Sequence, residues 1–188
     1  MSACAHALAA TTRRVDTAGM RGRIGAVAIV VAPACAAPSE VEAVVYEEDT
    51  FLVLSAATEV CEPEVARERV LAEAYGTEAI APGSVVVRTG EPLRLLAVVH
   101  DLGRSPSWRE EWVAAALLAA LRESEARRLR SLSLPLLGRV HGQIEVERFF
   151  TLLHEALAHA QAQHLERLWV IAGQADLDDT KRLLERWS

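Results

Sequence analysis

The stretch "SLSLPLLGRVHG", residues 131–142, decides the fold because it joins a short buried strand to a loop that contains glycine. Residues 131–134 alternate small polar with apolar side chains, a pattern typical of a strand. Pro135 has no N–H to give to a neighbouring strand in a central ladder, so the strand is expected to end there. A helix is expected after the loop. A strand, a short loop and a helix in this order are typical of an α/β domain.

The loop that ends this stretch is a candidate anion site. Gly138 and Gly142 bracket Arg139, Val140 and His141. Backbone N–H groups that such a loop exposes just before a helix can donate to a phosphate or another anion. Most glycine pairs between a strand and a helix are turns with no ligand. Two interpretations therefore stay open, a phosphate-binding loop and a plain corner of the chain.

Strands and helices alternate on both sides of this stretch. In the second half, the sequence predicts strands over 83–90, 93–100, 131–134 and 167–172, and helices over 107–121, 144–163 and from Asp176. Residues 95–99 are apolar at every position, which favours a strand covered on both faces. We expect this strand and residues 132–134 to be neighbours in the centre of a sheet of about six strands. Ser107 and Glu110 have the spacing of a capping box at a helix start.

The first half of the chain is predicted to begin with a strand over 24–31. Two further strands, over 41–46 and 51–57, are expected to form a hairpin around the acidic turn 47–50. A helix over 62–76 follows. The complete order predicts the α/β class: a mixed, mostly parallel central sheet with helices on both faces, in a three-layer α/β/α sandwich.

No repeat or linker interrupts the chain after residue 40, so residues 21–188 are predicted to form one domain. Residues 1–20 are rich in alanine and are expected to be a disordered lead. An alternative interpretation takes residues 20–38 as a signal peptide with translation from Met20, because a basic start precedes an apolar stretch and small residues. We favour the strand over 24–31, since further residues precede Met20 in the sequence.

Composition argues against several classes of protein. The 188 residues have a formal net charge of −6, whereas general nucleic-acid binders usually present a basic stripe. Cys4, Cys35 and Cys61 have no CxxC spacing, which argues against disulfides and structural zinc and favours a reducing compartment. No apolar run is long enough for a transmembrane helix. The sequence therefore predicts a cytoplasmic protein with no cofactor and with no nucleic-acid or membrane partner.

Histidines are the candidate metal or catalytic residues. His154 and His159 are five positions apart on one predicted helix and diverge by about 140°, so they do not easily share a metal ion. His164 lies a further five positions on, and no metal site is predicted. His100, followed by Asp101, ends a buried strand, where it is either a general base or a hydrogen-bond partner of a neighbouring loop. No nucleophile motif, P-loop or dinucleotide glycine motif accompanies it, so no catalytic residue is assigned.

Two stretches of the chain resemble the macro domain. "PGSVVVRTGEPLRLLAVVHDLG", residues 82–103, precedes a predicted helix, and residues 131–142 precede another. The resemblance covers roughly residues 50–172 and implies the three-layer α/β/α fold of a family that binds ADP-ribose and related nucleotides. In that family, the loop after the second of these strands donates backbone N–H groups to the diphosphate. The resemblance therefore implies that residues 138–142 contact phosphate.

A second part of the implied site follows the second core strand, where the family usually carries an Asn-Ala-Ala-Asn run. Residues 55–58, "SAAT", take that place in one alignment, and residues 46–49, "YEED", take it in an alternative alignment. The implied ligand-binding residues are Ser55, Ala56, Ala57, Thr58, Gly138, Arg139, Val140, His141 and Gly142. Arg139 is expected either to supply charge to a phosphate or to fill the pocket and close it.

The family's glycine-rich first phosphate loop has no counterpart, because residues 59–63, "EVCEP", lead directly into the predicted helix. We therefore expect a divergent macro-like protein that binds ADP-ribose, a nucleotide or another phosphate ligand weakly and without catalysis. One alternative is a structural or protein-interaction module that uses the fold without a ligand, as a homo-oligomer or with a protein partner. The other is an active ADP-ribosyl hydrolase.

Overall fold

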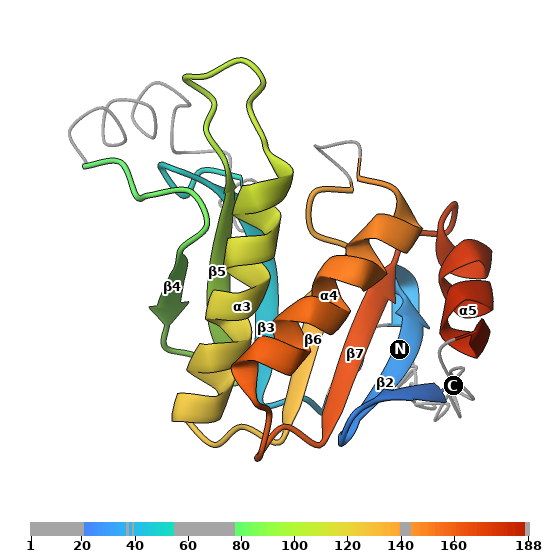
Figure 1. The fold of residues 1–188 in the computed structure, drawn as a ribbon. Helices are drawn as coiled ribbons and strands as arrows, with labels where there is room; N and C mark the ends of the chain where they lie inside the picture. Colours follow the sequence, from blue (N-terminus) through green and yellow to red (C-terminus); the bar gives the residue numbers. More distant parts are fainter. Residues whose placement is uncertain (1–20, 37, 39, 55–77, 140–143, 187–188) are drawn as a thin grey trace, which may run out of the picture.

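The computed structural model describes residues 21–36, 38, 40–54, 78–139 and 144–186. Seven strands in these ranges form one sheet, in the order β1-β2-β7-β6-β3-β5-β4 (Figure 1). Their bounds are β1 (Arg21–Ile24), β2 (Val27–Pro33), β3 (Ala43–Asp49), β4 (Val85–Arg88), β5 (Leu93–His100), β6 (Ser131–Pro135) and β7 (Arg167–Ala172). The five inner strands are parallel, whereas β1 and β4 pair antiparallel at the two ends of the sheet. The predicted mixed, mostly parallel sheet is confirmed.

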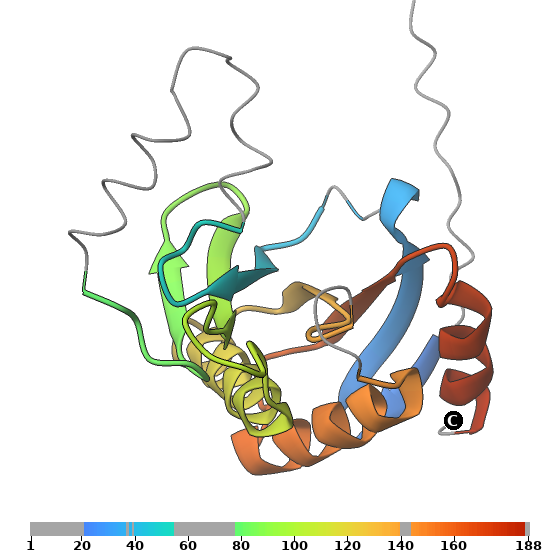
Figure 2. The same cartoon turned by 90° about the horizontal axis from the view of Figure 1, so that it is seen from above.

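Three described helices pack on this sheet: α3 (Glu110–Ala126), α4 (Val146–Ala160) and α5 (Leu177–Arg186). Seen from above, α3 and α4 lie along one face, and α5 lies beside β1 and β2 (Figure 2). A short 3-10 turn, η1 (Ala34–Ala36), follows β2. The predicted α/β class is therefore confirmed, while the helix predicted over 62–76 lies outside the described residues. Within the described ranges, no helix is both long and apolar enough to span a bilayer.

The core lies between the sheet and the helices because alternate residues of each strand point to the same face. Leu95, Ala97 and Val99 of β5 are fully buried in one cluster with the inner side of α3. From α4 come Phe149 and Phe150, whose rings meet edge to face with 5.8 Å between their centroids. Burying one large apolar side chain contributes about 1.5–3 kcal/mol. This layer therefore holds α3 and α4 firmly against the strands that end at the candidate site.

The hairpin predicted around residues 47–50 is wrong. β3 continues through Glu47, Glu48 and Asp49, and residues 50–54 form turns instead of a second strand. β3 is an inner strand that pairs with β5 on one side and β6 on the other. Acidic side chains can occupy such a strand only when donors from elsewhere in the fold reach them. Glu47 and Asp49 both have such donors.

The predicted adjacency of residues 95–99 and 132–134 is also wrong, because β3 lies between β5 and β6. The two segments share the sheet, as expected. The chain leaves β5, passes along α3 and enters the sheet again one strand further on. With 17 residues, α3 extends for about 25 Å at 1.5 Å per residue, which returns the chain from the carboxyl end of β5 to the amino end of β6.

Two other element starts differ from the prediction. The strand expected over 24–31 is divided between β1 and β2 by a turn in which Gly25 has a φ of +59°. Ser107 does not cap α3, which begins at Glu110 without a side-chain capping bond. Instead, Trp108 forms an antiparallel bridge with His100, and the Ser107 carbonyl accepts the N–H of Asp101 at 2.7 Å. These residues extend the pairing of β5, so the helix starts later.

Candidate functional site

The candidate site lies at the carboxyl ends of parallel strands. β3, β5, β6 and β7 end together at the top of the sheet in Figure 1, and these four ends form what we call the carboxyl edge. In open α/β sheets, ligands bind in crevices outside the carboxyl ends of the strands. The loop from Gly138 starts at this edge, directly after β6.

β3 and β6 separate before they reach the carboxyl edge. Their ladder pairs Ala43 with Leu132 and Val44 with Ser133, and then stops. β3 nevertheless stays paired with β5 as far as Asp49, and β6 stays paired with β7 as far as Pro135. The carboxyl halves of β3 and β6 therefore form a fork, and Glu47 lies in the part of β3 that borders it.

Glu47 bridges this fork with its carboxylate. Its Oε2 accepts the backbone N–H of Gly138 at 2.9 Å, and its Oε1 accepts a hydrogen bond from Nε2 of His100 at 2.5 Å. The side chains of Glu47 and His100 are 11% and 1% exposed. The side-chain partner of His100 thus belongs to a neighbouring strand and not to the loop that one interpretation expected, and the general-base interpretation stays a prediction. Two donors compensate the cost of burying the carboxylate.

Gly138 is a position that only glycine fits. Its φ is +74°, in the left-handed region, and a Cβ there would lie 2.9 Å from Cγ2 of Val113 and 3.1 Å from Cδ1 of Ile144. The backbone is thus pressed against α3 and against the residues that lead into α4, with its N–H directed to Glu47. The loop donates to an anionic group, and that group is a carboxylate of the protein.

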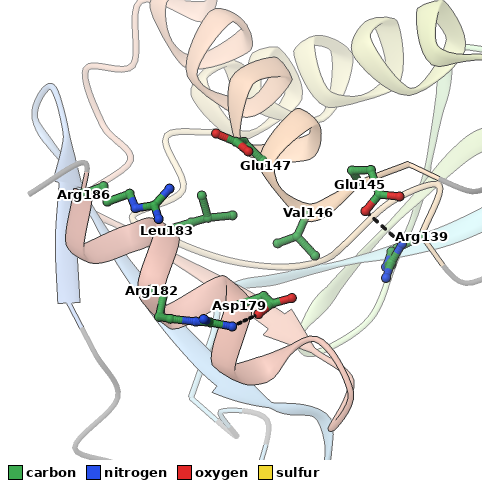
Figure 3. Close-up of a pocket in the computed structure, with 8 residues that line it drawn as sticks. All are labelled: Arg139, Glu145, Val146, Glu147, Asp179, Arg182, Leu183 and Arg186. Atoms are coloured by element: carbon green, nitrogen blue, oxygen red, sulfur yellow. Dashed lines mark hydrogen bonds and ion pairs between the residues drawn. The ribbon is translucent and has the colours of Figure 1, made fainter.

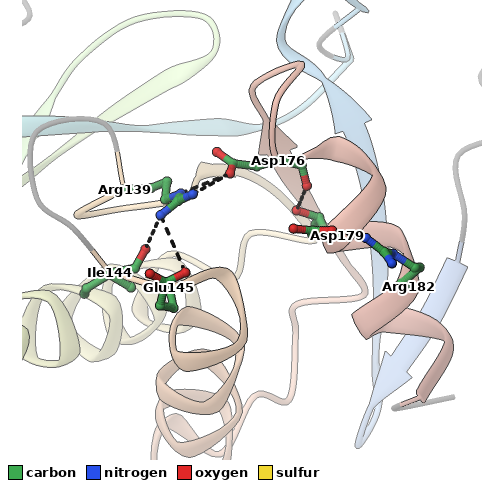
Figure 4. Close-up of polar contacts among 7 residues, drawn as sticks. Arg139, Ile144, Glu145, Asp176, Asp179 and Arg182 are labelled. Carbon is green, nitrogen blue, oxygen red and sulfur yellow. Dashed lines mark hydrogen bonds and ion pairs between the residues drawn. The ribbon is translucent and has the colours of Figure 1, made fainter.

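Arg139 links two loops of the carboxyl edge (Figure 4). Its Nε and Nη2 donate to Oδ1 of Asp176 at 3.0 and 2.9 Å, and its Nη1 donates to the carbonyl of Ile144 at 3.2 Å. Glu145 lies 3.9 Å from the same Nη1. The hydrogen bonds that Arg139 donates to Asp176 raise the pKa of Arg139 against the opposing effect of desolvation. The guanidinium is therefore engaged by protein groups, and its predicted contact with phosphate stays a prediction.

Asp49 organises the turn that leaves β3. The side chain is fully buried, and its two oxygens accept the backbone N–H groups of Phe51 at 2.6 Å, Val53 at 3.0 Å and Leu54 at 3.1 Å. The backbone of Thr50 also donates to the carbonyl of His100 at 2.9 Å, so the chain stays attached to β5 as it turns. This turn fixes the direction in which the chain leaves the sheet toward residue 55.

The structure describes two of the nine predicted ligand-binding residues, Gly138 and Arg139. The other seven, Ser55, Ala56, Ala57, Thr58, Val140, His141 and Gly142, lie outside the described residues, so their roles stay predictions. Residues 46–49, the alternative alignment, are the ones at the end of the inner strand. Sequence reasoning did not assign Glu47, Asp49 or Asp176 to the site. The sequence feature that could have identified Glu47 and Asp49 is the acidic run 47–49, which directly follows the apolar residues of a predicted strand.

His159 and His164 bond to groups away from the carboxyl edge. His159 Nδ1 bonds to the carbonyl of Glu155 at 2.7 Å, one turn earlier in α4, and His164 Nδ1 bonds to Oε2 of Glu125 at 3.0 Å. Among the residues that the structure describes, no group of three or more histidine, cysteine or acidic side chains could hold a metal ion. Cys35, in η1, is an exposed free thiol.

A hollow of about 350 Å³ lies next to Arg139, between the first turn of α4 and helix α5 (Figure 3). Val146 and Leu183 form its apolar part. Its charged residues are Arg139, Arg182, Arg186, Glu145, Glu147 and Asp179. Arg182 is paired with Asp179. Because three cationic and three anionic side chains line this hollow, its charge does not favour an anion over a cation.

Solved structures similar to this chain include several macrodomains. A macrodomain of Oceanobacillus iheyensis solved with ADP has a TM-score of 0.66 at 16% identity, over 90% of this chain and 96% of that chain. The macrodomain of Thermus aquaticus DarG has a TM-score of 0.55 at 22% identity, over 76% and 97%. The macro domain of ganglioside induced differentiation associated protein 2 has a TM-score of 0.60 at 11% identity, over 85% and 83%.

No family model and no curated protein matches the sequence. At these low identities, the structural likeness establishes the fold. The chain has the macrodomain fold, and the resemblance predicted from the sequence is confirmed at that level.

Proposed function

We propose that the protein is a non-catalytic binding module for ADP-ribose, a related nucleotide or another phosphate ligand, acting in the cytoplasm. The macrodomain fold supports this proposal, since structures of that fold have been solved with ADP and with ADPR. The observation that carries it is the backbone N–H of Gly138, which is held at the carboxyl edge and directed to an anionic oxygen. A phosphate oxygen is a chemically equivalent acceptor for such an amide.

The proposed absence of catalysis is supported by the contacts of two groups. Glu47 and His100, which could move a proton at this edge, are hydrogen-bonded to each other. A general base must reach the proton that it removes, at about 2.6–3.2 Å. The second oxygen of Glu47 is occupied by the loop, which leaves this pair poorly placed to activate water. We therefore expect no release of ADP-ribose from an ADP-ribosylated protein.

Binding is expected to be weaker than in a macrodomain with complete phosphate loops. Glu47, Glu48 and Asp49 place three acidic residues at the end of β3, and negative charge at this position opposes a diphosphate. Each hydrogen bond to a charged oxygen that the site fails to make costs roughly 1.5–3 kcal/mol. Two such losses weaken binding at least about a hundredfold, because about 1.4 kcal/mol corresponds to a factor of ten.

Titration calorimetry with ADP-ribose on the wild type and on Arg139→Ala tests this function. Arg148→Ala is a matched control, because Arg148 is also held by one carboxylate, that of Glu110. We expect weak, saturable binding to the wild type and the control. Low-micromolar binding to the wild type and to Arg139→Ala would contradict the weakened site. Binding lost in Arg139→Ala alone would identify Arg139 as a phosphate ligand.

A second candidate function is a protein-interaction module without a small ligand. The observation that favours it is that donors at the carboxyl edge are already bonded to carboxylates of the protein. Gly138 donates its backbone N–H to Glu47, and Arg139 donates to Asp176. Light scattering after size-exclusion chromatography would reveal a homo-oligomer. A stable oligomer combined with no saturable nucleotide binding would favour this second function.

A further inference from the structure

We propose that Glu47 is an internal competitor for phosphate, whose carboxylate occupies the loop amide that an incoming phosphate oxygen needs. This inference rests on the proposed function, because it states what sets the affinity of the same site. It predicts that the ligand must displace Glu47 from Gly138, and that removing the carboxylate increases the affinity for phosphate compounds.

The position of the Glu47 carboxylate is fixed from two sides. Gly138 has one backbone N–H, and Glu47 Oε2 accepts it at 2.9 Å, a normal length for a full hydrogen bond. The other oxygen is bound to His100, which is buried at the end of β5. A phosphate cannot share this amide without moving Glu47, because both acceptors would need the same hydrogen.

Charge reinforces this competition. Asp49, two residues further along β3, is saturated by the amides of its own turn and gives the edge a second carboxylate. Arg139 follows Gly138 directly, but its guanidinium is hydrogen-bonded to Asp176 and to the Ile144 carbonyl. No hydrogen bond or ion pair joins Arg139 to Glu47 in the described part of the chain. A phosphate at Gly138 would therefore face Glu47 as a repelling neighbour as well as a competitor.

Two variants separate the hydrogen bond from the charge. Glu47→Ala removes both, so the Gly138 amide becomes available. Glu47→Gln keeps an acceptor for that amide and removes only the charge. A hydrogen bond to a charged group is worth roughly 1.5–3 kcal/mol, so we expect Glu47→Ala to bind about 10–100-fold more tightly. Glu47→Gln should show a smaller increase in affinity.

Glu42 offers a matched control within the same segment of chain. Its carboxylate also accepts backbone N–H groups, those of Arg130 and Ser131, but at the opposite edge of the sheet. Glu42→Ala therefore removes a carboxylate that bonds to amides next to β3, without touching the carboxyl edge. We expect its affinity for phosphate compounds to equal that of the wild type.

The experiment is calorimetry of the four proteins with inorganic pyrophosphate and, separately, with ADP-ribose, after thermal denaturation has shown that each is folded. The amide proton of Gly138, followed by NMR, should move upfield in Glu47→Ala because it loses a carboxylate acceptor. Tighter binding of both compounds by Glu47→Ala is the expected result. If Glu47→Ala does not fold, a smaller gain in Glu47→Gln is the expected result.

The outcomes distinguish this inference from the proposed function. Pyrophosphate bound more tightly by the Glu47 variants, with no binding of ADP-ribose to any protein, supports the competition and contradicts nucleotide binding. Equal affinity of the wild type and the Glu47 variants for ADP-ribose contradicts the competition and leaves the function intact. If no protein binds either compound, both proposals are overturned.

Discussion

Glu47 and Glu125 are carboxylates at opposite edges of the same sheet, and both bind the backbone of a loop. Glu125, near the end of α3, accepts the N–H groups of Gln163, His164 and Leu165, and also Nδ1 of His164, at 3.0–3.2 Å. Glu47 accepts a single backbone N–H, from Gly138. The loop next to Glu125 connects α4 to β7 at the amino ends of the strands.

The difference lies in the number of backbone N–H groups that each carboxylate accepts, one for Glu47 and three for Glu125. Both oxygens of Glu125 accept hydrogen bonds from one loop. The amides of this loop are therefore already bound to an anionic group of the protein. At the carboxyl edge, beside the fork between β3 and β6, Glu47 accepts one loop amide and the side chain of His100. The same chemical interaction therefore lies at the amino ends of the strands in one case, and in the other at their carboxyl ends, where open α/β sheets bind ligands.

The largest effect that tests this comparison is expected from Gly138→Ala. The added Cβ would meet Val113, which is fully buried, and the residue would keep a φ of +74°. Left-handed strain and overpacking together cost about 2–5 kcal/mol. Gly25→Ala is the control, since Gly25 has a φ of +59° but open space around it, and should cost about 1–2 kcal/mol. Chemical denaturation measures both, and equal losses would show that the close approach to α3 is unimportant.

An intermediate effect is expected from Glu125→Ala. It removes the acceptor of three loop amides and should lower the free energy of unfolding by about 1–3 kcal/mol at neutral pH. Burial alone would raise the pKa of Glu125, but the backbone hydrogen bonds from Gln163, Leu165 and His164 and the His164 side chain outweigh it and lower the pKa below its ordinary 4.5.

The lowered pKa of Glu125 determines how its contribution to stability depends on pH. With a depressed pKa in the folded state, the stabilising contribution of Glu125 is complete above pH 4.5 and is lost as the pH falls through the folded-state pKa. The difference between the wild type and Glu125→Ala should therefore shrink in acid. Denaturation curves at several pH values check this, and a difference that stays constant below pH 4.5 would contradict it.

The smallest effect on stability is expected from Arg139→Ala. Its side chain is 30% exposed, and its main bonds are to Asp176. Partly exposed ion pairs contribute up to about 1 kcal/mol, and salt screens them. We expect a loss of that size at low salt that diminishes at high salt. Thermal denaturation at two ionic strengths measures it, with Arg148→Ala as the control.

The local sequence pattern was sufficient to predict those strands and helices in which all residues favour the same secondary structure. β5 and β7 have the bounds predicted from the sequence, over 93–100 and 167–172, because each is a mostly apolar run between clear turn signals. α4 forms within its predicted range because its apolar residues repeat at helical spacing. In these segments, propensity and burial favour the same structure.

The apolar half of β3 lies in the strand predicted over 41–46, but its acidic end could not be predicted because it depends on distant residues. The partners of Glu47 are His100, 53 positions away, and Gly138, 91 positions away. Without knowledge of these partners, the acidic run 47–50 is interpreted as a solvent-exposed turn. The order of β5, β3 and β6 has a similar cause, since nothing in the apolar pattern of 95–99 specifies how far α3 carries the chain. Gly138 was assigned to the candidate site from the sequence of its own loop. Glu47 was missed because its partners are distant in the sequence.

The pairing of β2 with β7 has a consequence for synthesis on the ribosome. β2, with its largely buried sequence VAIVVAP, has its parallel partner in β7, and the two strands lie far apart in the chain. During translation, β1 can pair with β2 as soon as both have left the exit tunnel. The other side of β2 then stays without its native neighbour until β7 has been made. We expect chaperones that recognise apolar strands to bind the nascent chain over this interval, and release to follow the appearance of residues 167–172.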